Sequence, residues 1–228
     1  MLDRNVVFVD YTAENFMLEN IHIENTYAYT NGNDQQADAL AIVADNVTVI
    51  NTELFGFQDT LLMDAVPDGK AVTRQYFKKC YITGNVDFIY GSGTAVFDDC
   101  DIVARYTPYK EEGCFTAART YENVPFGLIF NKCRFYEEAG IAPGAYRLAR
   151  PWGASANTVF LDCYMSSVVA DAGYGDMSGN SFKNARFAEY NTYGAGFKVN
   201  NDRPLLSKEQ AEIYRNVNAG IRDKAVKL

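Results

Sequence analysis

The chain has 228 residues, 48% of them hydrophobic and 22% charged, a composition typical of a globular protein with one substantial core. Its net charge of −8 and isoelectric point of about 4.7 argue against nucleic acid as a partner, because phosphates need a basic surface, and against electrostatic binding to anionic membranes. No apolar run is long enough to span a bilayer.

The first predicted element is a strand at Val6–Val9. The residues before it, Met1-Leu2-Asp3-Arg4, do not form a signal peptide. A secreted form would therefore have lost its signal peptide, or the sequence is one part of a longer chain.

Six segments that follow share one pattern, and they begin 31, 28, 20, 33 and 30 residues apart. They are 16–23, 47–54, 75–82, 95–102, 128–135 and 158–165. Their first column is apolar throughout: Leu18, Val49, Phe77, Phe97, Phe130 and Phe160. Three residues later comes a second column, which holds cysteine in the last four copies, and two residues beyond that comes a third, apolar column. A regular repeat of this kind predicts one structural unit per copy.

The residue just before the cysteine column is always polar: Asn20, Asn51, Lys79, Asp99, Lys132 and Asp162. The apolar columns on its two sides are out of phase by one residue, which a tight corner between two strands would correct. Asn and Asp tolerate left-handed backbone angles well, so they suit such a corner. The pattern predicts an all-β fold, a single-stranded parallel β-helix of about 20 residues or more per coil. An antiparallel sandwich is the alternative, but it would not repeat one corner chemistry in register.

The cysteines of the second column, Cys80, Cys100, Cys133 and Cys163, are interpreted as small core residues stacked in a ladder. An odd total of five does not suggest a disulfide scaffold. A disulfide between Cys80 and Cys100 stays open for an oxidising compartment, because these two copies are separated by the shortest interval.

The end of the sequence changes character. Ser207-Lys208-Glu209-Gln210 forms a capping box, and the pattern that follows predicts a helix within 207–222, packed on the solenoid. The whole chain, 1–228, is expected to form one domain.

Several kinds of catalytic site are disfavoured by composition. The chain has one histidine, His22, in a strand-like segment, so a Ser-His-Asp triad or a histidine-rich zinc site would depend on it alone. There is no glycine-rich phosphate loop and no loop of calcium-ligand spacing. We therefore expect no cofactor and no metal.

Carboxylate chemistry remains, and two aspartates stand out. Asp59 lies seven residues after Thr52, and Asp87 lies seven residues after Cys80, in the same column of consecutive repeats. Equal offsets predict that the two carboxylates lie side by side on one face. Two like charges so close cannot both ionise freely, so one pKa should rise and the other fall, giving an acid and a nucleophile.

Four motifs in order resemble those of the pectin methylesterase (pectinesterase) family: Gln36-Ala37-Asp38-Ala39-Leu40, Gly56-Phe57-Gln58-Asp59-Thr60-Leu61, Val86-Asp87-Phe88-Ile89-Tyr90-Gly91 and Leu148-Ala149-Arg150-Pro151-Trp152. The resemblance implies a right-handed parallel β-helix that hydrolyses methyl esters of galacturonate in pectin. It implies a protein that is secreted, periplasmic or at the cell surface. Its partner would be methyl-esterified homogalacturonan, and we expect a monomer.

The resemblance also implies roles. Asp87 would be the nucleophile, Asp59 the general acid and then the base, and Arg150 the group that holds Asp87 ionised. Gln36 and Gln58 would donate hydrogen bonds to the oxyanion. The residues expected to bind the sugar are Trp152, Phe57 and Tyr90.

Some positions depart from the family pattern. Gly84-Asn85 replaces Gly-Thr, Ala149 replaces a glycine, and a late Gly-Trp segment has become Gly173-Tyr174-Gly175-Asp176-Met177, which predicts an altered cleft wall at Tyr174 and Met177. The family's N-terminal coil is not found. An esterase or thioesterase acting on another ester, or a non-catalytic carbohydrate-binding β-helix, are the alternatives, and a polysaccharide lyase ranks last.

Overall fold

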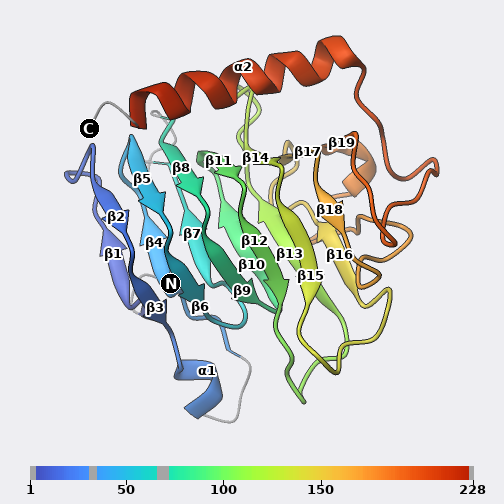
Figure 1. The fold of residues 1–228 in the computed structure, drawn as a ribbon, viewed down its shortest axis with the longest axis horizontal. Helices are drawn as coiled ribbons and strands as arrows, with labels where there is room; N and C mark the ends of the chain where they lie inside the picture. The colour runs from blue at the N-terminus through green and yellow to red at the C-terminus, as the bar shows by residue number, and fades with distance from the viewer. Residues whose placement is uncertain (1–3, 31–34, 66–71, 226–228) are drawn as a thin grey trace.

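The computed structural model describes residues 4–30, 35–65 and 72–225, and it is a parallel β-helix, as the repeat predicts (Figure 1). Each coil contributes one strand to each of three parallel sheets, here called sheets A, B and C. Sheet A contains β1 (Val7–Val9), β4 (Leu40–Ile42), β7 (Leu61–Met63), β10 (Val86–Gly91), β13 (Gly113–Ala118) and β16 (Tyr146–Ala149).

Sheets B and C hold the repeated segments. Sheet B contains β2 (Met17–Glu19), β5 (Val47–Ile50), β8 (Arg74–Lys78), β11 (Thr94–Asp98), β14 (Leu128–Asn131), β17 (Asn157–Leu161) and β19 (Arg186–Tyr190). Sheet C contains β3 (His22–Glu24), β6 (Glu53–Phe55), β9 (Tyr81–Gly84), β12 (Asp101–Ala104), β15 (Arg134–Glu137) and β18 (Tyr164–Met165). The predicted pair of strands per coil is thus completed by a third strand in sheet A, which the repeat did not reveal.

The corner between sheets B and C has the predicted geometry. All six polar corner residues have a left-handed backbone, with φ between 45° at Asn51 and 58° at Asn20. Lys79 and Lys132 adopt it as well, at 52° and 56°, although lysine gains nothing from that conformation. The corner side chains also stack, since Asn51 Nδ2 donates to Asn20 Oδ1 at 2.7 Å. The left-handed corner residue turns the chain sharply, so the side chains of the first column before it and of the cysteine column after it both point into the core.

The first column forms the centre of the core. Phe77, Phe97, Phe130 and Phe160 stack on one another in register, with ring centroids 4.6, 4.5 and 5.3 Å apart and nearly parallel planes. All four rings are buried completely. The cysteine column beside them is buried too, and all five cysteines are free thiols.

A seventh coil, at β19, follows the same plan with different chemistry. Glu189 pairs in register with Phe160 and occupies the aromatic column, and Asn191 forms the left-handed corner. Glu189 is fully buried and forms an ion pair with the equally buried Arg203, whose Nε and Nη2 donate at 2.7 and 2.8 Å. Thr192, in the cysteine column, donates a further hydrogen bond to Glu189. A paired charge therefore ends the aromatic ladder.

Among the described residues, the sheets are accompanied by the helices α1 (Tyr27–Thr30), the 3₁₀ helix η2 (Phe182–Asn184) and α2 (Lys208–Ala225). Helix α2 begins with a reciprocal cap, in which Ser207 N donates to Gln210 Oε1 and Gln210 N donates to Ser207 Oγ. Figure 1 shows α2 running along the solenoid, across the strands of sheet B. Its buried Ala211 and Ile221 pack on Tyr76, Val96 and Ile129 of that sheet, which leaves sheet A uncovered by helix α2.

Candidate active site

Asp59 and Asp87 lie in neighbouring coils at the same level of sheet A. Asp59 immediately precedes Thr60 and β7, and Asp87 is the second residue of β10. Strand β7 pairs with β10 at Leu61 and Ile89, a spacing of 28 residues that also separates the two aspartates. Asp59 N donates to Val86 O at 3.1 Å, which fixes the two coils against each other at this point.

Both aspartates have left-handed backbones, with φ of 66° at Asp59 and 50° at Asp87. Asp87 lies in an irregularity of the β10–β13 ladder, where the register shifts between Val86 and Ile89. A bulge of this kind inserts an extra residue and redirects its side chain. Non-glycine residues in this region are strained and often mark functional positions. The backbone thus turns both carboxylates out of the regular alternation of the strands.

Arg150 distinguishes the two carboxylates. Its Nε and Nη2 donate to the two oxygens of Asp87 at 2.6 and 2.5 Å, a two-pronged charge-assisted contact. Its own backbone is held by a hydrogen bond from Arg150 N to Thr116 O at 3.0 Å. Asp87 is 3% exposed and Asp59 is 4% exposed, so water screens neither. Only one member of the pair is matched with a guanidinium group.

The electrostatics follow from that difference. The pKa of Asp59 is raised to about 8. Burial is the largest cause, and the nearby charges of Asp87 and Asp38 add to it, while the charges of Arg150 and Lys110 lower the pKa by a smaller amount. Burial also raises the pKa of Asp87, but the hydrogen bonds and charge of Arg150 act against that rise. A proton shared by the pair therefore belongs on Asp59, which leaves Asp87 as the carboxylate.

The two glutamines differ in their surroundings. Gln58 is half-buried, and Lys110 Nζ donates to its Oε1 at 3.0 Å. This contact ties down the amide oxygen and leaves the NH2 group as the end that can donate to a ligand. Gln36 is exposed, one coil away, where Ala37 N donates to Gln58 O at 3.1 Å. The two amides therefore come from adjoining coils next to Asp59.

The three aromatic residues expected at the sugar site fall into two groups. Tyr90 and the half-buried Trp152 pack together on the outer face of sheet A, with ring centroids 5.7 Å apart, and Arg119 stacks on Trp152 at 4.1 Å. Phe57 is buried and lies under Arg105, whose guanidinium is 4.4 Å from the ring. Tyr90 has another partner, since its hydroxyl donates to Asp38 Oδ1 at 2.7 Å.

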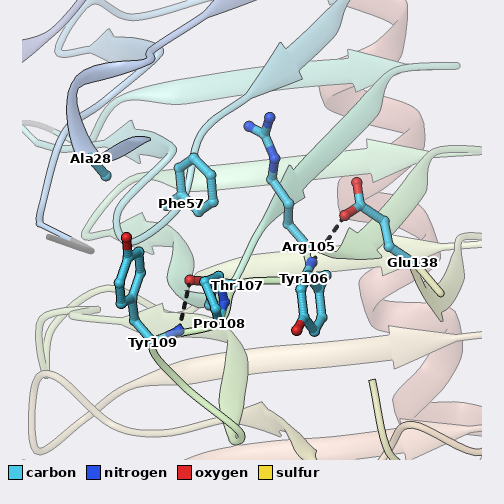
Figure 2. A pocket seen from close by; sticks show the side chains of 8 residues that line it. All are labelled: Ala28, Phe57, Arg105, Tyr106, Thr107, Pro108, Tyr109 and Glu138. Carbon is cyan, nitrogen blue, oxygen red and sulfur yellow. Dashed lines mark hydrogen bonds between the residues drawn. The ribbon is translucent and has the colours of Figure 1, made fainter. Parts of the chain in front are cut away.

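Two hollows lie near residues of the candidate site, one at Phe57, which precedes Gln58 in the sequence, and one at Arg150. One has a volume of about 680 Å³ and is lined by Phe57, Arg105, Tyr109 and neighbouring residues, which Figure 2 shows around a single space. The other, of about 390 Å³, is lined by Arg150, Arg147 and Cys114 among others. The first hollow is lined mainly by aromatic side chains, and the second by charges of both signs, with Glu112 and Asp176 beside the two arginines.

The predicted alteration of the cleft wall is only partly correct. Tyr174 is 2% exposed and belongs to the core, where its hydroxyl donates to Glu189, and it lines a different hollow, together with Phe182 and Pro204. Met177 packs with Tyr90 and Trp152, and Gly175 and Asp176 line the hollow at Arg150. Tyr174 forms a parallel bridge with Ala149, and the sequence alone did not show which residues of this segment face the core.

Sequence reasoning also missed two residues. Asp38 lies 21 residues before Asp59, the same spacing as the paired Leu40 and Leu61, so it belongs to the same ladder. The equal-offset rule does not reach Asp38, because the residue seven positions after Ile21 is Ala28, and the connection to sheet A is ten residues longer in this coil. Lys110 comes from a loop between sheets C and A, and no sequence pattern points to it.

No group of potential metal-ligating side chains was found in the described part of the chain. Among the same residues, no helix is both long and apolar enough to cross a membrane.

Comparisons with known proteins agree with this geometry. The family model described as "Pectinesterase" matches residues 5–208. The chain belongs to the pectinesterase family. A tomato (Solanum lycopersicum) pectinesterase/pectinesterase inhibitor is 30% identical over 89% of this chain and 35% of its own length, and Arabidopsis thaliana pectinesterase 31 is 33% identical over 86% and 57%. The chain therefore spans about a third to somewhat over half of these curated relatives.

Solved pectin methylesterase structures share the fold. That of Erwinia chrysanthemi superposes with a TM-score of 0.82 at 29% identity, covering 92% of this chain and 70% of that one. Another pectin methylesterase structure, in complex with a hexasaccharide, has a TM-score of 0.79 at 28% identity, with the same coverage.

Proposed function

We propose that this protein is a carboxylic ester hydrolase that removes methyl esters from galacturonate units of pectin and releases methanol. The observation that carries the proposal is the asymmetry of two adjacent buried carboxyls. Arg150 donates two hydrogen bonds to Asp87, while the pKa of Asp59 is raised to about 8. One carboxyl is suited to attack and the other to give up a proton. Family membership and the hexasaccharide bound to a structural neighbour support a polysaccharide ester as substrate.

In the first half of the reaction, an oxygen of the Asp87 carboxylate attacks the carbonyl carbon of the methyl ester. The oxyanion that forms accepts hydrogen bonds from the amide NH2 groups of Gln58 and Gln36. The bond to the methoxy oxygen breaks, Asp59 transfers its proton to that oxygen, and methanol leaves. The galacturonate acyl group stays bound to Asp87 as an anhydride.

In the second half, Asp59 is a carboxylate and takes a proton from water. The resulting hydroxide attacks the acyl carbon, and the bond to Asp87 breaks. The products are the galacturonic acid, which loses its proton to solvent, and the Asp87 carboxylate, which is again paired with Arg150, and Asp59 ends with its proton restored. The net change is one ester and one water converted into one acid and one methanol.

The polysaccharide would lie across the outer face of sheet A. The half-buried Trp152 offers part of its ring to a sugar, as aromatic faces commonly do, with Tyr90 behind it and Phe57 in the neighbouring hollow. Methylation masks the acids of the substrate, so a protein of net charge −8 can bind it. Since pectin lies outside cells, we propose a secreted, periplasmic or cell-surface location and action as a monomer.

Methanol release from highly methylated pectin tests the proposal. We expect activity with the unaltered chain and a loss of at least about 10³-fold with Asp87→Asn, which keeps the shape of the side chain and removes the attacking charge. Asp101→Asn, on sheet C, is the matched control and should retain full activity. Equal activity in Asp87→Asn would refute the nucleophile. Binding of pectin without methanol release, in the unaltered chain, would favour a carbohydrate-binding module, and release only from other esters would favour a different esterase.

A further inference from the structure

Asp38 is a third carboxyl in the column of Asp59 and Asp87. Backbone hydrogen bonds on both sides fix it there, from Ala37 N to Gln58 O at 3.1 Å and from Ala39 N to Thr60 O at 2.8 Å. Neighbouring strands of a parallel sheet are about 4.8 Å apart. Three carboxyls therefore lie on consecutive coils, with Asp59 in the middle.

Asp38 is buried as deeply as the other two, at 1% exposed. Its partner is Tyr90, whose hydroxyl donates to Oδ1 at 2.7 Å from two coils away. Burial and nearby carboxylates raise the pKa of Tyr90 far above its ordinary value, so Tyr90 keeps the proton that it donates to Asp38. A donated hydrogen bond favours the charged form of a carboxyl. Tyr90 thus spans the coil of Asp59 and holds a negative charge on its far side.

We propose that Asp38 is a positioning residue that keeps the proton on the general acid Asp59, and that Tyr90 holds Asp38 in place for this task. The inference rests on the proposed esterase activity, in which Asp59 must carry a proton to release methanol. A negative charge on each side of Asp59 opposes the loss of that proton. The side chain of Asp38 hydrogen-bonds to Tyr90, and its charge acts on Asp59, so its effect on the reaction is exerted through Asp59.

The raised pKa values of Asp38 and Asp59 agree with this role for Asp38. Burial raises the pKa of Asp38 to about 7, and that of Asp59 lies at about 8, with Asp38 among the charges that raise it. The other charged groups facing the cluster are Asp87 on β10, Arg150 after β16 and Lys110 before β13, and Asp64 after β7 acts on Tyr90.

The pH dependence of kcat for methanol release tests this inference. Asp38→Asn keeps the shape of the side chain and an oxygen that accepts from Tyr90, but it removes the charge. We expect the alkaline limb of the profile, set by loss of the Asp59 proton, to move down by about one pH unit. The acid limb, set by Asp87, should move much less. A role confined to folding would lower activity by the same factor at every pH and leave both limbs in place.

Tyr90→Phe provides a second variant that keeps the ring against Trp152. Without the hydroxyl, Asp38 holds its own proton to higher pH, so the alkaline limb should also move down, by less than in Asp38→Asn. Once Asp38 is Asn, the added Tyr90→Phe change should move the limb no further. Asp101→Asn should leave the profile unchanged.

The two proposals fail in different ways. An inactive unaltered chain would contradict the esterase function itself. An active unaltered chain whose alkaline limb coincides with that of Asp38→Asn would overturn only the role of Asp38. If Asp38→Asn does not fold, the Tyr90→Phe profile decides: an unmoved limb in that variant overturns the inference as well.

Discussion

Two columns of this β-helix place like side chains on like, with opposite consequences. In sheet B, Phe77, Phe97, Phe130 and Phe160 stack at centroid distances of 4.5–5.3 Å. In sheet A, Asp38, Asp59 and Asp87 are stacked by the same coil spacing. Neutral rings gain packing from repetition, whereas repeated buried carboxyls repel one another and lose hydration. The fold supplies proximity in both places, and the chemistry of the residue decides whether proximity stabilises the protein or perturbs an acid.

Removing the guanidinium group that pairs with Asp87 should have the largest effect. Arg150→Ala leaves Asp87 buried without its guanidinium partner, so Asp87 should take up a proton near neutral pH and stop attacking. We expect kcat/KM for methanol release to fall by about 10³–10⁴-fold, equivalent to about 4–5 kcal/mol. Arg150→Lys keeps the charge without the two-pronged contact and should lose less. A profile in which the acid limb does not move to higher pH in Arg150→Ala would contradict this account.

Breaking the aromatic column should affect stability and spare the chemistry. Phe97 is fully buried between Phe77 and Phe130, and Phe97→Ala should lower the free energy of unfolding by about 3–4 kcal/mol. Urea denaturation measures this change. Phe97→Leu, which fills most of the space, should lose about 1–2 kcal/mol. Methanol release per folded molecule should stay within about twofold of the unaltered chain in both variants, and a large loss would show that the two columns are coupled.

Neutralising the middle carboxyl should stabilise the protein while abolishing its activity. The folded-state pKa of Asp59 is about 8 against an ordinary 3.8, so the folded state binds an extra proton between these values. Its contribution to stability therefore falls as pH rises through that window. Asp59→Asn should raise the free energy of unfolding by about 2 kcal/mol at pH 8 and by less at pH 5. An equal gain at both pH values would show that the charge is not the cause.

The smallest change concerns the corners. Lys79 has a φ of 52°, a conformation that Asn tolerates better than Lys, and it follows Asn20 and Asn51 in the stack. Lys79→Asn should extend this amide ladder and raise the free energy of unfolding by about 0.5–1 kcal/mol. Thermal denaturation measures it. Lys78→Asn, one residue earlier in β8, should give no gain, and a similar gain there would point to charge and not to the corner.

The parts of the fold that follow a strict period could be predicted from the sequence. The six corners and the inward columns are such features, because each needs one residue type at one offset. The strand β1 of sheet A was predicted at Val6–Val9, but the later strands of that sheet were not, because no shared column marks them: β7 is Leu61–Met63, whereas β13 is Gly113–Ala118. The seventh coil escaped because Glu189 stands in the aromatic column, and only the distant Arg203 makes that substitution tolerable.

The residues of the candidate site likewise fall into those that the repeat predicts and those that it does not. Asp59 and Asp87 could be paired from equal offsets, since the period carries them to one face. The Tyr90–Asp38 hydrogen bond could not, because it skips a coil and depends on where a bulge directs the chain. Lys110 reaches Gln58 from an aperiodic loop, where spacing carries no information.

The buried Glu189–Arg203 pair also bears on assembly. A stack of similar coils has no internal feature that limits its length. An open strand edge at its end can pair with a strand of another molecule. Here the edge of β19 is already occupied, since Glu189 N donates to Pro204 O and Leu206 N donates to Glu189 O. Beneath that edge, a fixed charge replaces the ring on which a further apolar coil would have to stack. This end of the protein is therefore closed to fibre-like growth by both its backbone and its core.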